Sequence, residues 1–206
     1  MNEKFFKLPK EKRLCIINAG LEVFSQHDYK RAVTDDIAAK AGISKGLLFY
    51  YFHNKGELYR FLFDYGLQAL REQVVDERFS ELTDFFELLS YAAEKKMKLL
   101  TQLPYLFDFT IRAYFSKEEN VLQIIRETTR DALDNQMSTY FKNVDLSKFR
   151  EGVDLEQIMR MMVWMTEGYM QEKRRSNAGL RLEQMKKDFN DWVNMFRKLA
   201  YREEYL

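Results

Sequence analysis

The chain has 206 residues, of which only two are proline and eight are glycine, and its formal net charge is +1. Because both residue types interrupt helices, their scarcity predicts an all-α protein. A single cysteine, Cys15, excludes an internal disulfide and a cysteine-rich zinc site. No run approaches the roughly 18 apolar residues of a membrane span. No signal peptide opens the chain either, so we expect a soluble, cytoplasmic protein.

The charge is unevenly distributed along the chain. Residues 1–55 carry ten basic and six acidic side chains, a net of +4, whereas the remainder carries 23 against 26, a net of −3. A basic N-terminal quarter on a mildly acidic body is typical of a nucleic-acid-binding module. A basic face without such a role is equally common, so charge alone leaves the function open.

The first predicted helix covers residues 10–26. Apolar side chains recur in it at helical spacing from Leu14 to Phe24. Cys15 lies in this stretch, and we expect it to be a small buried hydrophobe. Gly20 should cost the helix about 1 kcal/mol unless a neighbouring group packs closely against it.

Two very short helices follow. We expect Thr34 to be the N-cap of the first, which Gly42 ends after about two turns. Ser44 is the expected N-cap of the second, which runs over about 45–51, and Asn54 is the expected N-cap of a long helix. Such a tight pair of helices presents the second as a ridge narrow enough for the major groove of DNA.

The rest of the chain is predicted to form long helices with brief breaks, which gives about nine helices in all. We expect them near residues 55–78, 83–102, 105–115, 118–143, 155–175 and 181–204. The functional boundary falls at the start of the first of these. It divides a helix-turn-helix DNA-binding domain, 1–55, from a helical effector-binding and dimerisation domain, 56–206.

The second short helix carries side chains suited to duplex DNA. Lys45 can reach a guanine edge or a phosphate, and Leu47 can pack on a thymine methyl group. Gly46 allows the backbone to approach the sugar-phosphate chain. We expect Tyr50 and Tyr51 to face outward and offer hydroxyls to phosphates.

The buried side of the same helix is expected to consist of Leu48 and Phe52, which are spaced i, i+4. Lys55 opens the next helix, where free N–H groups also attract phosphate. The predicted DNA-binding residues are Thr34, Ser44, Lys45, Gly46, Leu47, Phe49, Tyr50, Tyr51 and Lys55.

Residues 14–58 resemble the N-terminal segment of the TetR family of bacterial regulators. The matching positions are Ile16, Ile17, Ala19, Gly20, Val23, Phe24, Tyr29, Thr34, Ile37, Ala38, Ala41, Gly42, Ile43, Ser44, Lys45, Gly46, Tyr51, Phe52, Lys55 and Leu58. Asp28 stands where the family usually has glycine, and Gly20 stands where it usually has alanine. Phe49 stands where it usually has a tyrosine whose hydroxyl holds a phosphate.

The resemblance implies a repressor that binds double-stranded operator DNA as a homodimer and is released by a small molecule bound in the helical body. We expect an effector of apolar or aromatic character, although aromatic stripes are more often core than pocket. The candidate effector-binding residues are Tyr91, Phe107, Phe109, Tyr114, Phe115, Trp164 and Met165.

The last helix carries an a/d-type seam of apolar residues from Leu182 to Leu199. Such a seam can bury inside the monomer or between two copies, and the resemblance places the dimer interface on the last two helices. The candidate interface residues are Met162, Thr166, Met170, Phe189, Trp192, Val193 and Phe196.

Three alternatives stay open at this stage. A DNA-binding activator fits the same residues, and a helical adaptor without a DNA role explains the helices but not the short helix pair. An enzyme is disfavoured because no phosphate-binding loop, nucleophile elbow or paired acid and base stands out. His27 and His53 have no partner at metal-ligand spacing, so we expect no metal and no cofactor.

Overall fold

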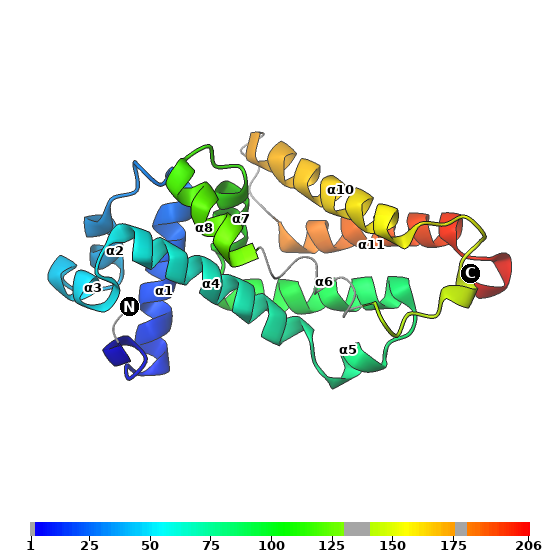
Figure 1. Cartoon of the computed structure of the whole chain (residues 1–206), viewed down its shortest axis with the longest axis horizontal. Helices are drawn as coiled ribbons and strands as arrows, with labels where there is room; N and C mark the ends of the chain where they lie inside the picture. The colour runs from blue at the N-terminus through cyan, green and yellow to red at the C-terminus, as the bar shows by residue number, and fades with distance from the viewer. Residues whose placement is uncertain (1–2, 130–140, 176–180) are drawn as a thin grey trace. The chain divides into compact units, whose positions relative to one another are not determined.

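The computed structural model describes residues 3–129, 141–175 and 181–206 (Figure 1). Within these ranges the chain forms ten α-helices, and its one β feature is an isolated bridge between Phe149 and Tyr201. The all-α prediction is therefore confirmed. No helix in the described ranges is long and apolar enough to cross a bilayer.

The helices form two compact units. The first contains residues 3–72 and 99–129, and the second contains residues 73–98, 141–175 and 181–206. Both α4 and α6 contribute to both units. The units reflect packing, so the proposed functional boundary at residue 55 stays a prediction.

The first unit contains the N-terminal helices and those that pack on them. Its elements are η1 (Glu3–Phe5), α1 (Lys10–Gln26), α2 (Thr34–Lys40), α3 (Lys45–Phe52), most of α4 (Lys55–Val74), the end of α6 (Phe85–Gln102), α7 (Leu106–Tyr114) and α8 (Glu119–Thr129). The bounds of α1 are those predicted from its apolar spacing.

Helix α1 is the central element of this unit and contacts both α2 and α7. Leu21 and Phe24 are fully buried along it. A Cβ added at Gly20 would stand 2.6 Å from Leu62 Cδ1 on α4. Close packing of α4 therefore explains the glycine in the middle of α1. Cys15 lies exposed, and the expectation that it is buried is wrong.

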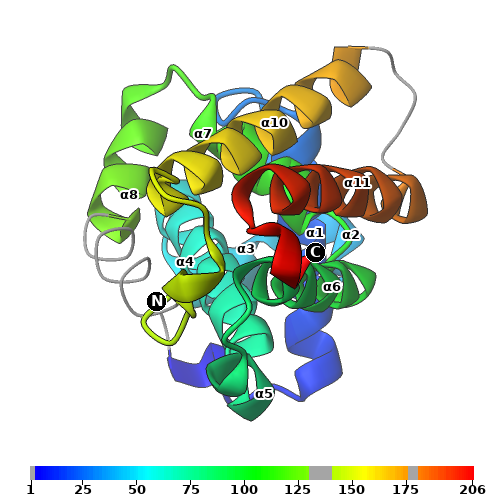
Figure 2. The same ribbon diagram turned by 90° about the vertical axis from the view of Figure 1, so that its right-hand side faces the viewer.

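The second unit contains the C-terminal helices. Its elements are α5 (Glu77–Glu81), most of α6, η2 (Leu146–Lys148), α10 (Leu155–Arg175), α11 (Leu182–Ala200) and η3 (Glu203–Tyr205). Helices α10 and α11 lie side by side in Figures 1 and 2. Phe85, Phe86, Phe149, Phe196 and Tyr201 form the centre of its core.

Several predicted helix ends are wrong. The helix expected over 55–78 ends at Val74, because Asp76 caps a separate helix by accepting a hydrogen bond from Phe79 N at 3.0 Å. The last helix ends at Ala200 because Tyr201 turns into the core. Of the helix expected over 118–143, residues 119–129 are helical and 141–143 form a turn, while 130–140 lie outside the described residues.

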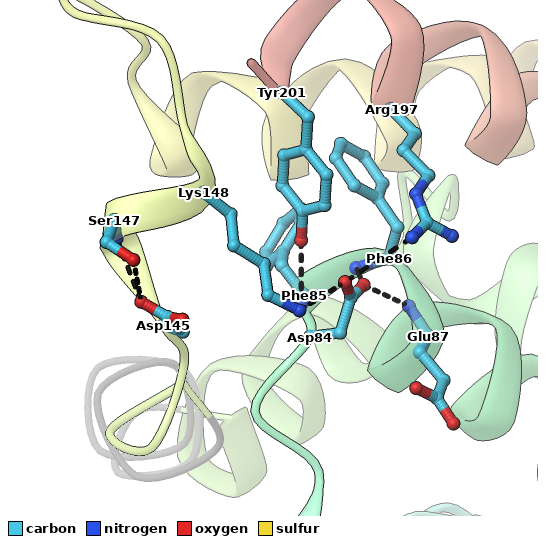
Figure 3. A network of polar contacts seen from close by, with 9 residues as sticks. All are labelled: Asp84, Phe85, Phe86, Glu87, Asp145, Ser147, Lys148, Arg197 and Tyr201. Atoms are coloured by element: carbon cyan, nitrogen blue, oxygen red, sulfur yellow. Dashed lines mark hydrogen bonds and ion pairs between the residues drawn. The ribbon is translucent and has the colours of Figure 1, made fainter. Parts of the chain in front are cut away.

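A buried carboxylate ties the end of α11 to the start of α6 (Figure 3). Asp84 is 6% exposed, and its Oδ1 accepts hydrogen bonds from Phe86 N and Glu87 N at 3.1 and 3.0 Å. Lys148 Nζ donates to Asp84 Oδ2 at 2.9 Å, and an Arg197 guanidinium nitrogen lies 3.6 Å from the same oxygen. Two cations and a helix N-terminus thus compensate the buried charge.

Candidate nucleic-acid interface

The turn between α2 and α3 has the hydrogen bonds of a Schellman motif. Ile43 N donates to the Ala38 carbonyl at 3.0 Å, and Gly42 N donates to the Ala39 carbonyl at 3.1 Å. Gly42 adopts a φ of +61°, a conformation that glycine takes without steric cost. The predicted break at Gly42 is confirmed, and it fixes the direction in which α3 leaves the turn.

Two of the three predicted helix caps are confirmed. Leu47 N donates to Ser44 Oγ at 3.1 Å, and Glu57 N donates to Asn54 Oδ1 at 2.9 Å. The predicted cap at Thr34 is wrong, because Thr34 is the first residue of α2 and Val33 occupies the N-cap position without a side-chain hydrogen bond. The starts of α3 and of α4 are therefore fixed by local polar contacts.

One face of α3 is open. Leu47 and Tyr50, spaced i, i+3, are 37% and 41% exposed. A Cβ at Gly46 would meet only Ser44 Oγ, at 3.9 Å. Within the described ranges, no packing therefore requires a glycine at this helical position, where glycine costs about 1 kcal/mol relative to alanine.

The other face of α3 is packed into the unit. Leu48 and Phe52 are fully buried, as predicted, and Phe49 is half-buried. The expectation that Tyr51 faces outward is wrong, because its ring is 7% exposed and lies 5.8 Å from the ring centroid of Phe5. Only Tyr50 of the two tyrosines belongs to the open face.

The two lysines that flank α3 are engaged by neighbouring groups. Lys45 Nζ lies 2.8 Å from Asp35 Oδ2 in an exposed ion pair. Lys55 Nζ lies 4.8 Å from the ring centroid of Tyr29 and donates to the Lys30 carbonyl at 3.3 Å. Partial burial lowers the pKa of the Lys55 ammonium, although the charge of Glu118 opposes that shift.

The backbone after α3 is strained at His53. His53 has a φ of +61°, and Asn54 N donates to the Phe52 carbonyl across it at 2.6 Å. A non-glycine residue in such a tight turn is uncommon and costs free energy. The turn lets Asn54 cap α4 directly after α3 ends. The sequence holds no signal for this, since histidine usually adopts negative φ.

Sequence reasoning missed a contact between the N-terminal segment and α3. Phe5 in η1 is 1% exposed, and Lys4 Nζ lies 5.4 Å from the ring centroid of Tyr50. The signal that could have revealed it is the pair Phe5 and Phe6 within an otherwise lysine-rich start. Two adjacent apolar rings ahead of the first helix indicate a segment that packs on the body.

The candidate effector residues are divided between the two units. Phe107, Phe109, Tyr114 and Phe115 belong to the first unit, where Phe109 is fully buried and Tyr114 is 61% exposed. The remaining three, in the second unit, are Tyr91, Trp164 and Met165.

Among these three, Tyr91 lines a half-open hollow of about 190 Å³, together with Phe189 and Asn190. Its hydroxyl donates to Asp76 Oδ2 at 2.7 Å. Trp164 is 62% exposed. A second hollow, of about 300 Å³, is lined by Phe61 and Tyr65 in the first unit.

Most candidate dimer residues are covered within one chain. Met162, Met170, Val193 and Phe196 are at most 6% exposed, and Phe189 and Trp192 pack against the same core. Thr166 donates its hydroxyl hydrogen to the Met162 carbonyl at 2.8 Å. The apolar side chains that α10 and α11 leave exposed are instead Met161, Val163, Trp164, Met195 and Leu199.

Comparisons with known proteins agree with this geometry. A family model described as bacterial regulatory proteins, tetR family, matches residues 16–61, which include α2, the turn and α3. The fatty acid metabolism regulator protein of Bacillus subtilis (strain 168) is 24% identical over 160 residues, or 78% of this chain and 81% of the relative.

Two solved structures share the fold. SmeT, the repressor of the Stenotrophomonas maltophilia multidrug efflux pump SmeDEF, has a TM-score of 0.66 at 20% identity, and the match covers 97% of this chain and 93% of SmeT. FadR from Bacillus subtilis, in complex with stearoyl-CoA, has a TM-score of 0.62 at 20% identity, covering 86% and 95%.

Proposed function

The chain belongs to the TetR family of bacterial transcriptional regulators, and we propose that it is a repressor that holds operator DNA as a homodimer until a small molecule releases it. Regulators of this family bind operator DNA as dimers. Because its partner is the bacterial chromosome, its site of action is the cytoplasm. An activator that binds DNA through the same helix is the alternative.

The open face of α3 carries the proposal. Among the residues that the structure describes, none packs so closely on Gly46 that a glycine is needed, and Gly46 stands beside the exposed Leu47 and Tyr50. Because Gly46 has no Cβ, the sugar-phosphate chain of DNA can come close to the backbone of α3. The neighbouring apolar side chain of Leu47 can then reach a base edge. The functional site is therefore the ridge formed by residues 44–50.

The roles of individual residues follow from their positions. Leu47 is placed to contact a thymine methyl, and Tyr50 to donate to a phosphate. Lys45 can leave Asp35 to reach DNA, because the exposed ion pair between these two side chains is weak. Thr34 and Lys55 flank the ridge at the starts of α2 and α4 and belong to the phosphate contacts.

Phe49 and Tyr51 are less exposed than Leu47 and Tyr50, the exposed side chains of the same helix. Tyr51 is removed from the proposed DNA contacts because its ring is buried. Phe49 is half-buried and lacks a hydroxyl, so it contributes packing at the edge of the ridge.

The exposed apolar side chains of α10 and α11 support the dimer. Met161 and Trp164 are three residues apart, and Met195 and Leu199 are four apart, so each pair shares a helix face. Each pair leaves large apolar side chains exposed on its helix, and a second copy would cover such side chains. We therefore move the proposed interface from the buried seam to these exposed positions.

The effector we propose is a small molecule with a long apolar chain. Matches in Bacillus subtilis support this class: a curated relative named for fatty acid metabolism, and a solved FadR structure with stearoyl-CoA bound. The helical body of this chain is rich in phenylalanine, tyrosine and methionine, which suit an apolar ligand. We therefore propose a long-chain acyl thioester as the effector of this chain.

Selection from a pool of random duplexes with purified protein tests the function. We expect an enriched palindromic site, protection of it in footprinting, and release on addition of stearoyl-CoA. A site that binds but is not released by acyl thioesters would remove the effector class and keep the repressor. Absence of any duplex binding would favour the helical adaptor and overturn the proposal.

A further inference from the structure

The N-terminal segment of the chain is anchored to α3 and α4 by one aromatic ring. Phe5 lies 4.9 Å from the ring centroid of Phe52 on α3 and 5.2 Å from that of Phe61 on α4. With 1% of its surface exposed, Phe5 is a core residue. Burying an aromatic ring contributes enough free energy to hold a short segment in place.

A second contact fixes the segment where it joins α1. Arg13 on the first turn of α1 donates to the Phe6 carbonyl. Leu8 N donates to the Phe5 carbonyl at 3.2 Å, and Pro9 then begins α1 at its N-cap. Residues 3–9 thus form a short arm with a defined path.

The arm places positive charge beside the open face of α3. Lys4 Nζ lies 5.4 Å from the ring centroid of Tyr50, the tyrosine that α3 exposes. The contact with Tyr50 raises the pKa of the Lys4 ammonium, so this lysine keeps its charge throughout the physiological range. Lys7 is also exposed on the arm.

We propose that residues 3–7 are a second DNA-contacting element, in which Phe5 is the anchor and Lys4 binds the backbone phosphate next to the one that Tyr50 contacts. Lys7 extends the positive charge along the same strand. This inference rests on the proposed function. It concerns residues outside the segment that the family model matches, which begins at residue 16.

A purely structural role for Lys4 predicts different behaviour. A lysine over an exposed tyrosine ring contributes to folding and has no bearing on counterions. A lysine on a phosphate releases a counterion, and the slope of log affinity against log salt changes by about 0.9 for each phosphate contact in duplex DNA. The salt slope therefore separates the two roles.

The experiment compares wild type, Lys4→Ala, Lys4→Arg and Lys142→Ala on two duplexes over a range of salt concentrations. One duplex is selected by the wild-type protein from a random pool, and the other has a scrambled sequence. Lys142 is an exposed lysine of the second unit, so its alanine variant controls for the loss of one charge. Thermal unfolding of each variant measures folding independently.

We expect Lys4→Ala to bind both duplexes more weakly by a similar factor and to flatten the slope by about two for a dimer, one contact from each subunit. Lys4→Arg should restore the slope, and Lys142→Ala should match wild type. Phe5→Leu keeps an apolar side chain at the anchor and should flatten the slope less than Phe5→Ser does. Phe5→Ser should flatten the salt slope by the same amount as Lys4→Ala, provided that its unfolding curve still shows a folded protein.

If the salt slope of Lys4→Ala is unchanged while the wild-type protein binds its selected duplex tightly, residues 3–7 do not contact DNA. The proposed function would then still stand. Loss of binding to the selected duplex alone would also overturn this inference, because a phosphate contact carries no sequence preference. Failure of the wild-type protein to bind either duplex would overturn both this inference and the proposed function.

Discussion

Arg112 on α7 and Asp28 after α1 form an ion pair of 2.8 Å, and Arg112 Nε also donates to the Ser25 carbonyl at 2.7 Å. One guanidinium thus joins α7 to the end of α1. Asp28 stands where the family usually has glycine, so the ion pair is made by a residue that departs from the family pattern. Ser25 is 7% exposed, so its carbonyl depends on this donor.

The two contacts of Arg112 should differ in their effect on stability. Asp28→Asn removes the charge of a side chain that is 61% exposed, and we expect a loss below about 1 kcal/mol. Arg112→Ala leaves the Ser25 carbonyl without its donor and should cost about 1–3 kcal/mol. Urea unfolding of both variants measures the difference. Equal losses would show that the exposed ion pair, and not the carbonyl contact, is the stabilising interaction.

Gly20 in α1 and Gly46 in α3 should respond in opposite ways to alanine. Gly46→Ala meets open space and should stabilise the fold by up to about 1 kcal/mol, whereas its methyl group obstructs DNA and should weaken operator binding at least about tenfold. Gly20→Ala pushes against Leu62 and should destabilise the fold by about 1–3 kcal/mol.

Unfolding curves and operator titrations of the two glycine variants form a matched pair. Gly46→Ala should lose DNA binding while gaining stability, and Gly20→Ala should lose stability. If Gly46→Ala bound its operator as tightly as wild type, the close approach of DNA to this part of α3 would be excluded.

Asp84 should give the fold a measurable dependence on acid. Burial raises the pKa of its carboxyl, but the hydrogen bonds from Lys148 and Glu87 N and the nearby cations outweigh it, and the net pKa falls below the ordinary 3.8. A pKa that is lower in the folded state stabilises the fold in full above the unfolded value. That contribution is lost as pH falls below about 4 toward the folded value.

Asp84→Asn tests this dependence. The variant keeps the size of the side chain but leaves Lys148 and Arg197 without their counterion, and we expect a loss of about 3–5 kcal/mol near neutral pH. The gap between wild type and variant should narrow as the pH falls below about 4. A gap that stays constant down to acid would assign the stability of this network to shape and not to charge.

Local signals explain which parts of the fold could be predicted from the sequence. The limits of α1, the turn at Gly42 and the caps at Ser44 and Asn54 depend on residues close together in the chain. Tyr51 was misplaced because its partner, Phe5, lies 46 positions away and is joined to it only by folding. A helical pattern reports which residues share a face but not what covers that face.

The seam of α11 is the clearest example of this limit. Phe196 lies on an apolar stripe, as its spacing predicts, and side chains of α6 and α10 of the same chain pack against that stripe. Leu199, the last residue of the predicted seam, and Met195 remain exposed. Spacing alone could not distinguish these two apolar faces, because both repeat at intervals of three and four.

The proposed dimer surface gives the final prediction, in which Trp164 is compared with Phe196. Trp164→Glu places a charge on an exposed position, so each chain should stay folded but a desolvated interface should be lost. Phe196→Ala removes a buried ring and should cost about 3–5 kcal/mol of stability without changing the interface directly. Light scattering should show Trp164→Glu shifted to monomer, with a salt slope of DNA binding about half that of wild type, since half of the phosphate contacts are lost. A dimer that survives Trp164→Glu and dissociates only with Phe196→Ala would return the interface to the seam.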